Sequence, residues 1–436
     1  MNQENSNFNL KSITDQVSST PLRFIKILLG ILLTYFTLRA YYYDVIIYSY
    51  VIQTFRYPVW PQLNWIINTV TIPYFFLGSL ICSIAIIFEK KFPWPFIGYL
   101  ICFIPIVVFD QTYYQDYQLA IIITCVLLSL TNPSHNNRTS FKWELLSIKC
   151  LFSIILMWRG VAYLYTDWLN GDVWHHAVST QLYYSPFLIK ALQHPALTAL
   201  IIALLPLLEI TSAILPWKHP RYLIITWIYF IAYSIFYSYG NSIFGFNPIM
   251  SILGILSIAF IPTSLFEQLK IRLTKKYPQQ SQSPTLSKPS RSRFLKPCLI
   301  IYVIIQLLLP FNIYVVKDQP WYNTIPSFAW TMKQESREYS GNFIIVDPVT
   351  NKVLDEVFAK DQIRYSSTIL TMAKKINQEY QEAYHISPRV YGNISIKINN
   401  RPRVPYINPE IDLSKVDYKL ERKPSWILPP PKGYFK

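Results

Sequence analysis

Long runs of apolar residues restrict the fold of this chain more than any other feature of its sequence. A membrane-spanning helix needs about 20 mostly apolar residues, and such runs recur from near the N-terminus to residue 312. We therefore predict an all-α membrane bundle of about nine transmembrane helices. The nine stretches are 23–40, 66–88, 96–109, 118–131, 146–165, 197–216, 222–239, 244–263 and 294–312.

The small share of charged residues agrees with this interpretation. Of the 436 residues, 52% are hydrophobic and 15% are charged, whereas a soluble protein carries about 25% charged residues. The net charge of +16 lies mainly in the links between apolar runs, so it forms no continuous basic surface over a soluble fold. The expected partner is membrane lipid, and no nucleic-acid partner is expected.

The positions of Lys and Arg predict the orientation. With the N-terminus placed in the cytoplasm, the inside links hold most of these residues, as the positive-inside rule requires. An odd number of spans then places the tail outside. The inside residues are Lys90, Lys91, Arg138, Lys142, Lys218, Arg221, Lys270, Arg272, Lys275, Lys276, Lys288, Arg291 and Arg293.

Changes in composition divide the chain into five parts. Residues 1–20 form a polar N-terminal tail, 21–265 a transmembrane domain, 266–293 a basic, flexible cytoplasmic linker, 294–312 the last transmembrane helix, and 313–436 an extracytoplasmic domain. In this last part, FIIVD, KVLDEVF and ISIKINN alternate apolar and polar residues, which is typical of strands. A helix at about 364–384 has Ile369, Met372, Ala373 and Ile376 on one face. We predict a small α+β, β-rich extramembrane domain.

Ionisable residues within apolar spans are costly and mark functional sites by default. Arg159 and Glu209 are the clearest examples. Arg159 stays charged, so it must face a carboxylate or a water-filled cavity. For Glu209 two interpretations stay open: a neutral carboxyl bonded between helices, or a member of a pocket. Asp110 and Asp167 lie near predicted span ends.

No metal site is expected from the sequence. The five cysteines lie in or beside apolar segments without a CxxC pair, and the adjacent His175 and His176 lack an evident third ligand.

Residues 159–187, RGVAYLYTDWLNGDVWHHAVSTQLYYSPF, resemble the central motif of the vitamin K-dependent γ-glutamyl carboxylase family and its bacterial relatives with a horizontally transferred transmembrane (HTTM) domain. Further similar motifs follow the family's order. They are PLRFIKILLG (21–30), DQTYYQDYQL (110–119), LEITSAIL (208–215), WYNTIPSFAWTMK (321–333) and INNRPRVPYINPEIDLS (398–414). The resemblance implies that residues 21–265 form an HTTM-like domain, and it extends to Trp426.

The resemblance also implies a chemistry. The family oxidises reduced vitamin K to its epoxide and carboxylates glutamates of a bound peptide, using a lysine to deprotonate the hydroquinone. Here Tyr163 occupies the position of that lysine. Burial favours the neutral amine of Lys, which is basic, but the neutral phenol of Tyr, which is not. Two family histidines are replaced by Tyr117 and Tyr237. The implied catalytic residues are Tyr163, Glu209 and Arg159, and the implied pocket residues are Asp110, Tyr117, Asp167, Trp168 and Tyr237.

Three functions follow as hypotheses. The first is a carboxylase-like membrane protein without the standard chemistry that binds a quinone, a lipid or a peptide. The second is a working γ-carboxylase and epoxidase, a lyase, with another base. The third is a factor for peptide maturation or export. The expected cofactor is reduced vitamin K or another quinone, the further partner a peptide or protein on the extracytoplasmic side, and the location a bacterial plasma membrane.

Overall fold

The structure is a computed structural model of the chain. The residues that it describes are 16–18, 20–42, 71–88, 93–109, 116–130, 139–164, 166–179, 186–241, 247–262, 264–266, 268, 292–308, 319–322, 337–358, 363, 366–416 and 424–434. Asp110 and nearly all of the predicted linker 266–293 lie outside these residues. Tyr237 lies in a described helix, but its side chain is not described.

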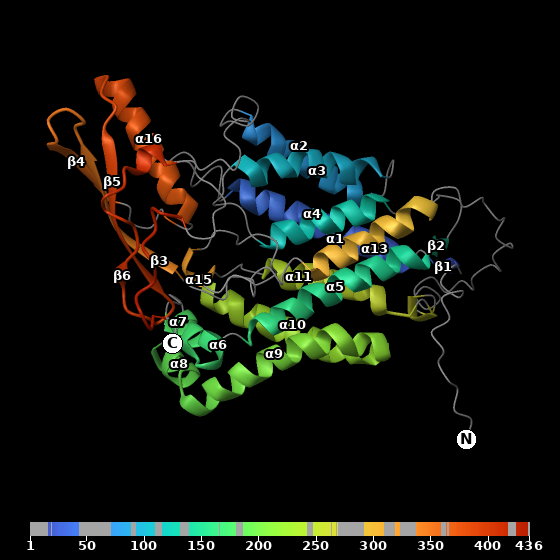
Figure 1. Cartoon of the computed structure of the whole chain (residues 1–436). Coiled ribbons are helices and arrows are strands. Elements are labelled where there is room, and N and C mark those ends of the chain that lie inside the picture. The colour runs from blue at the N-terminus through green and yellow to red at the C-terminus, as the bar shows by residue number, and fades with distance from the viewer. Residues whose placement is uncertain are drawn as a thin grey trace.

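Within the described ranges, a helix lies over each of the nine apolar stretches (Figure 1). These helices are α1 (Thr20–Ala40), α2 (Ile72–Ile87), α3 (Trp94–Phe109), α4 (Asp116–Leu130), α5 (Lys142–Ala162), α9 (Pro195–Lys218), α10 (Leu223–Asn241), α11 (Pro248–Ser257) and α13 (Ser292–Leu308).

Three helical segments are long and apolar enough to cross a membrane: Pro21–Ala40, Leu145–Ala162 and Pro195–Lys218. Shorter apolar helices such as α2, with 16 residues, rise about 24 Å at 1.5 Å per residue. That length is less than the roughly 30 Å of a bilayer's hydrocarbon core. The fold is thus mostly helical with three candidate spans, and the full count of nine stays a prediction.

Helices α1 and α2 bury small polar residues between them, and α2 exposes large apolar residues on its outer side. Ser79 and Ser83 of α2 are buried, and the Ser83 hydroxyl is 2.9 Å from that of Thr34 in α1. Leu77 and Ile81 of the same helix are exposed. Small polar residues between helices and large apolar residues on the outside are typical of helices packed in lipid.

Three short helices fold the link between α5 and α9. They are α6 (Thr166–Leu169), α7 (Asp172–Ser179) and α8 (Pro186–Leu192). Gly171 connects α6 to α7 with φ +83°, a left-handed conformation that glycine adopts without a Cβ clash. None of the nine predicted stretches covers this link, and α6, α7 and α8 form a small second layer at one end of the bundle.

The C-terminal part forms an antiparallel sheet with one long helix. Its elements are α15 (Gln319–Tyr322), β3 (Arg337–Val346), β4 (Val353–Phe358), α16 (Ser366–Tyr384), β5 (Arg389–Ile398), β6 (Val404–Pro405) and the 3-10 turn η6 (Leu413–Lys415), and the strand order is β4-β3-β5-β6. The three predicted strand segments fall in β3, β4 and β5, and the predicted helix is α16. Its predicted face is buried against the sheet: Ile369, Met372, Ala373 and Ile376.

Turn chemistry explains why β3 ends where it does. The Asp347 carboxylate accepts hydrogen bonds from the backbone N–H groups of Val349, at 2.7 Å, and Thr350. These bonds lower the pKa of Asp347. An Asp at the start of a turn bonds its own backbone in this way, so the turn after Asp347 separates β3 from β4.

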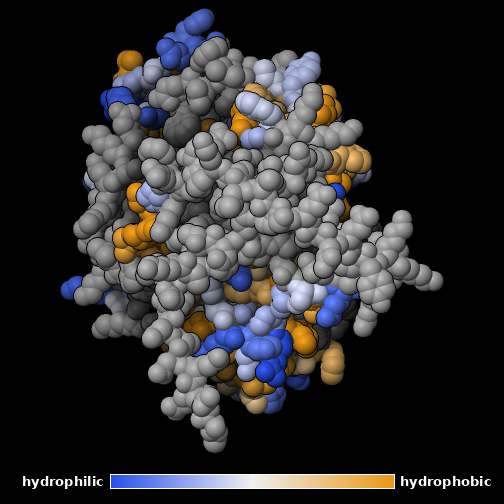
Figure 2. Space-filling view, turned by 90° about the vertical axis from the view of Figure 1, so that its right-hand side faces the viewer, coloured by the Kyte–Doolittle hydropathy of each residue, from blue (hydrophilic) through white to orange (hydrophobic). Residues whose placement is uncertain are grey.

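The sheet domain and the strand pair β1 (Gln16–Ser18) and β2 (Thr139–Phe141) lie at opposite ends of the helices (Figure 1). The short helices α6, α7 and α8 lie at the same end as the sheet. Figure 2 views the β1–β2 end, where hydrophilic residues gather in the lower part of the face and hydrophobic residues lie along its flanks. Helices α6, α7 and α8 and the C-terminal domain therefore share one end of the bundle.

Candidate functional site

A buried ion pair joins the two ionisable residues that the sequence singled out. Arg159 lies in the last turn of α5 and Glu209 inside α9, and Nη2 of Arg159 is 2.7 Å from Oε1 of Glu209. Their side chains are 2% and 0% exposed. Of the two alternatives for Arg159, the structure shows the partner carboxylate.

Two further helices complete the surroundings of this pair. The Tyr229 hydroxyl of α10 donates a hydrogen bond to Glu209 Oε1, and Arg159 Nη1 lies 3.7 Å from the sulfur of Met250 in α11. The Arg159 guanidinium also lies over the Tyr233 ring, 5.7 Å from its centre. Helices α5, α9, α10 and α11 thus meet at one charged centre.

Sequence reasoning missed Tyr229, Tyr233 and Met250 at this centre. The available signal was weak: Tyr229 and Tyr233 are four residues apart and therefore share a helix face. Nothing in that spacing distinguishes a site from lipid contact, because aromatic residues occur at many positions of this chain.

A glycine permits the close approach of α5 and α9 beside the pair. A Cβ on Gly160 would lie 2.6 Å from a side-chain carbon of Ile210 and 3.2 Å from its backbone nitrogen. Small residues at such crossings bring helix backbones together. Gly160 therefore lets Glu209 reach Arg159 within the packed core.

Tyr163 lies just beyond the end of α5, one turn after Arg159. The expected span ran to residue 165, but α5 ends at Ala162 and Tyr163 lies in a turn. Its side chain is 7% exposed, and its phenol interacts electrostatically with Arg159 and Glu209. The three residues expected to be catalytic are thus brought together, with Tyr163 nearer the end of the bundle than predicted.

An aromatic cluster of Tyr163, Trp168 and Trp174 forms the layer next to the ion pair. The rings of Tyr163 and Trp168 are 4.4 Å apart, and those of Trp168 and Trp174 6.5 Å. Each indole N–H donates to a backbone carbonyl, that of Trp168 to Ile202 and that of Trp174 to Leu192. The rings of α6 and α7 are therefore held against α9 and the end of α8.

Asp167 is engaged by the C-terminal domain. Arg401 donates hydrogen bonds from its two terminal nitrogens to the two carboxylate oxygens of Asp167. The Asn399 side-chain amide donates a third, at 2.7 Å. Asp167 is 1% exposed. The resemblance implies a pocket role for Asp167, and the structure adds an interdomain contact at this residue.

A second interdomain contact lies beside this one. His176 of α7 lies 3.8 Å from Glu338 of β3, which also binds Arg403 at 3.2 Å and faces Lys397. Burial, as the largest cause, lowers the pKa of His176, while Glu338 raises it and Lys397 lowers it. Both α6 and α7 are thus attached to the sheet.

The other expected pocket residues are not brought to this centre by any described contact. Tyr117 lies at the start of α4, half-buried, with its ring 6.0 Å from that of Phe36 in α1. Asp110 and the Tyr237 side chain lie outside the described part of the chain.

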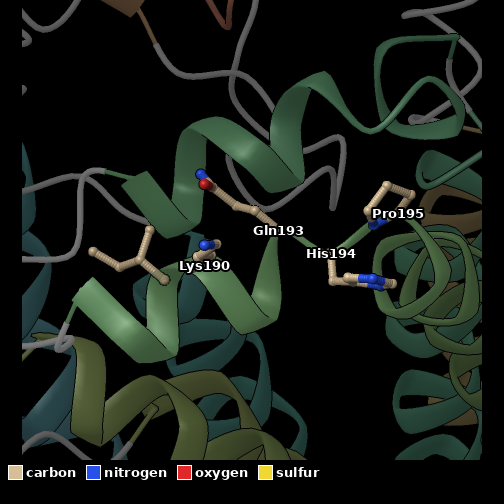
Figure 3. A pocket seen from close by; sticks show the side chains of 5 residues that line it. Lys190, Gln193, His194 and Pro195 are labelled. Carbon is tan, nitrogen blue, oxygen red and sulfur yellow. The ribbon is translucent and has the colours of Figure 1, made fainter.

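A shallow hollow of about 460 Å³ lies at the junction of α8 and α9 and is lined by Ile189, Lys190, Gln193, His194 and Pro195 (Figure 3). It includes none of the expected site residues. Across the described ranges, no three His, Cys, Asp or Glu side chains lie close enough together to hold a metal ion.

The side chains at the ion pair are compatible with a flat aromatic ligand that carries hydroxyl groups, the chemical class of a reduced quinone. Within the described residues, Oε2 of Glu209 is buried without a hydrogen-bond partner, so it has an acceptor site for a hydroxyl. Trp168 and Tyr163 offer aromatic surface nearby.

Comparison with known proteins supports the family resemblance for the C-terminal part. Residues 291–433 match the family model of the vitamin K-dependent gamma-carboxylase, lumenal domain. No curated protein and no solved structure matches the chain. Two of the motifs noted in the sequence, at 321–333 and 398–414, fall inside the matched region.

The match and the apolar helices together indicate a membrane protein with an extramembrane domain. Residues 291–433 are therefore similar to the lumenal domain of the vitamin K-dependent γ-carboxylases, and this match supports a γ-carboxylase-like family.

Proposed function

We propose that the protein is a multi-pass, γ-carboxylase-like membrane protein that binds a quinone, a lipid or a peptide and lacks the standard catalytic base. One observation carries this proposal. By the resemblance of the motif at 159–187, Tyr163 takes the position of the family's lysine, and the charged groups around it, Arg159 and Glu209, are paired with each other.

The chemistry of the family requires a group that removes a proton from the hydroquinone. A buried lysine serves because burial favours its free amine, whereas a buried phenol keeps its proton. Glu209 is a poor substitute, since its Oε1 already accepts from Arg159 and Tyr229. The centre formed by Arg159, Glu209 and Tyr163 is therefore better suited to binding a ligand than to removing a proton from it.

This chain's own residues account for binding. Glu209 Oε2 would accept a ligand hydroxyl, Arg159 would keep Glu209 in place, and Tyr163 and Trp168 would contact the ring. When bound, a reduced quinone supplies the precursor of the strong base that the family uses for carboxylation. A peptide partner would meet the extramembrane domain, which lies at the same end of the helices as α6 and α7 (Figure 1).

A second function is favoured by one specific contact. Arg159 interacts with the Tyr163 phenol, and an opposite charge stabilises a tyrosinate. In that case the protein is an active carboxylase and epoxidase, a lyase in which Tyr163 is the base.

The experiment compares the wild type, Tyr163→Lys and Tyr163→Phe in lipid nanodiscs with reduced vitamin K. It measures epoxide formation and labelled CO2 fixed into a glutamyl peptide, and it separately measures quinone binding by tryptophan fluorescence. The first proposal expects binding in all three and epoxide only in Tyr163→Lys. Epoxide from the wild type that Tyr163→Phe abolishes would establish the second function instead. If none of the three proteins bound the quinone, the proposal that this protein binds a quinone would be refuted.

We also propose nine spans with a cytoplasmic N-terminus, an extracytoplasmic C-terminal domain and a bacterial plasma membrane location. The expected partners are membrane lipid and a peptide or protein on the outer side. The basic links on one side of the predicted spans support this orientation.

A further inference from the structure

The contact between Asp167 and the C-terminal domain has a fixed geometry. Arg401 presents its planar fork to both oxygens of Asp167, and Asn399 adds a third donor. The Arg401 guanidinium is itself placed over the Tyr434 ring, 5.7 Å from its centre. A bidentate pair of this kind fixes orientation as well as distance.

The turn that carries Asn399 and Arg401 is stabilised by contacts within the C-terminal domain. The Tyr434 hydroxyl accepts from the N–H of Ile398 and donates to the carbonyl of Pro402. Asn399 adopts φ +53°, a left-handed conformation that asparagine tolerates better than most residues. The sheet therefore offers Arg401 and Asn399 on a fixed support.

Helix α6, whose Asp167 accepts these hydrogen bonds, has little rigidity of its own. Helix α6 has four residues, and a helix this short is not stable in isolation. Its position must therefore come from tertiary contacts. Asp167 is one of its four residues, and the next residue is Trp168, whose ring lies 4.4 Å from that of Tyr163.

We propose that Asp167 is a positioning residue: held by Arg401 and Asn399, it fixes α6 and so places Trp168 against Tyr163. The C-terminal domain thereby sets the shape of a centre that lies in the helical bundle. The inference rests on the proposed function in one respect, that Trp168 and Tyr163 contact the ligand.

Hydrogen–deuterium exchange in the full chain in nanodiscs tests this inference without a ligand. Arg401→Ala should accelerate exchange in the segment 163–171 by about tenfold or more, because local opening no longer has to break the ion pair. The matched control is Arg403→Ala. Arg403 lies in the same turn region and carries the same charge, but it binds Glu338 inside its own domain, so its removal should leave 163–171 unchanged. Unchanged exchange in Arg401→Ala would overturn the inference.

A second measurement separates positioning from simple loss of stability. Binding of reduced vitamin K is measured in Arg401→Ala, Arg401→Lys and Arg403→Ala at a temperature where all three are folded. The affinity should fall about tenfold in Arg401→Ala and less in Arg401→Lys, which keeps the charge but not the fork. If the wild type binds no quinone, the proposed function fails while the exchange result still decides the positioning role. Equal affinities in all variants would show that the contact only attaches the domain.

Discussion

Arg401 holds both carboxylate oxygens of Asp167, although the two residues are 234 positions apart in the sequence. Asp167 belongs to the central motif at 159–187 and Arg401 to the motif at 398–414. Two motifs that could be noted only as colinear in the sequence are therefore in direct contact in space. The contact is largely shielded from water, since Asp167 is 1% and the Arg401 side chain 13% exposed.

Removing one member of this pair should destabilise the docked protein strongly. Arg401→Ala leaves a buried carboxylate without its main partner, and breaking a buried pair in this way costs about 3–5 kcal/mol. Thermal unfolding in detergent should show a lowered midpoint. Arg403→Ala removes a partly exposed pair and should cost less than about 1 kcal/mol. Equal midpoints for the two variants would contradict the assignment, and a double-mutant cycle with Asp167→Asn would measure the coupling.

The buried pair of Arg159 and Glu209 should behave asymmetrically. Glu209→Leu leaves the guanidinium buried without its carboxylate and should lower the free energy of unfolding by about 3–5 kcal/mol. The double variant Arg159→Leu with Glu209→Leu removes both charges and should recover most of that loss, because neither desolvated charge remains. Unfolding curves of the three proteins test this. A double variant less stable than Glu209→Leu would mean that the pair does not act as a unit.

Two helical glycines should respond oppositely to alanine. Gly160→Ala places a Cβ 2.6 Å from Ile210 and close to its backbone, so α5 and α9 must separate. Overpacking of this kind costs about 1–3 kcal/mol. In contrast, the nearest atom to a Cβ on Gly254 is 4.0 Å away, and Gly254→Ala should be neutral or stabilise by up to about 1 kcal/mol through helix propensity. Melting temperatures of both variants decide the matter.

The folded protein should lose stability in acid through the burial of His176. Burial lowers the pKa of His176 in the folded protein, so the unfolded chain binds this proton more readily than the folded one. The contribution of His176 to the free energy of unfolding is therefore fully present above the ordinary histidine pKa of about 6.5. It falls as the pH decreases through that value. Melting temperatures at pH 7.5 and pH 5.5 should differ less in His176→Gln than in the wild type. The neighbouring variant His175→Gln serves as the control, and a wild type whose stability rises on acidification would contradict the prediction.

Local patterns predicted much of the fold. Alternation predicted β3, β4 and β5, and helical spacing predicted the buried face of α16, because periods of 2 and 3.6 residues follow directly from backbone geometry. Apolar runs predicted the positions of nine helices, though only three of the described segments are long and apolar enough to be candidate spans. The helices α6, α7 and α8 escaped prediction since short helices depend on tertiary contacts.

The sequence by itself determined that helices would form a membrane bundle, that a small sheet domain would follow, and that Arg159 needed a partner, because burial of a permanent charge requires compensation. Only the tertiary structure decided which partner that is. It placed Glu209 and Tyr229 beside each other at the centre, with Glu209 against Arg159, and it placed Asp167 against Arg401. The physical reason is that a charge's need for a counter-charge is a property of the residue, whereas the identity of the counter-charge depends on which distant surfaces pack together.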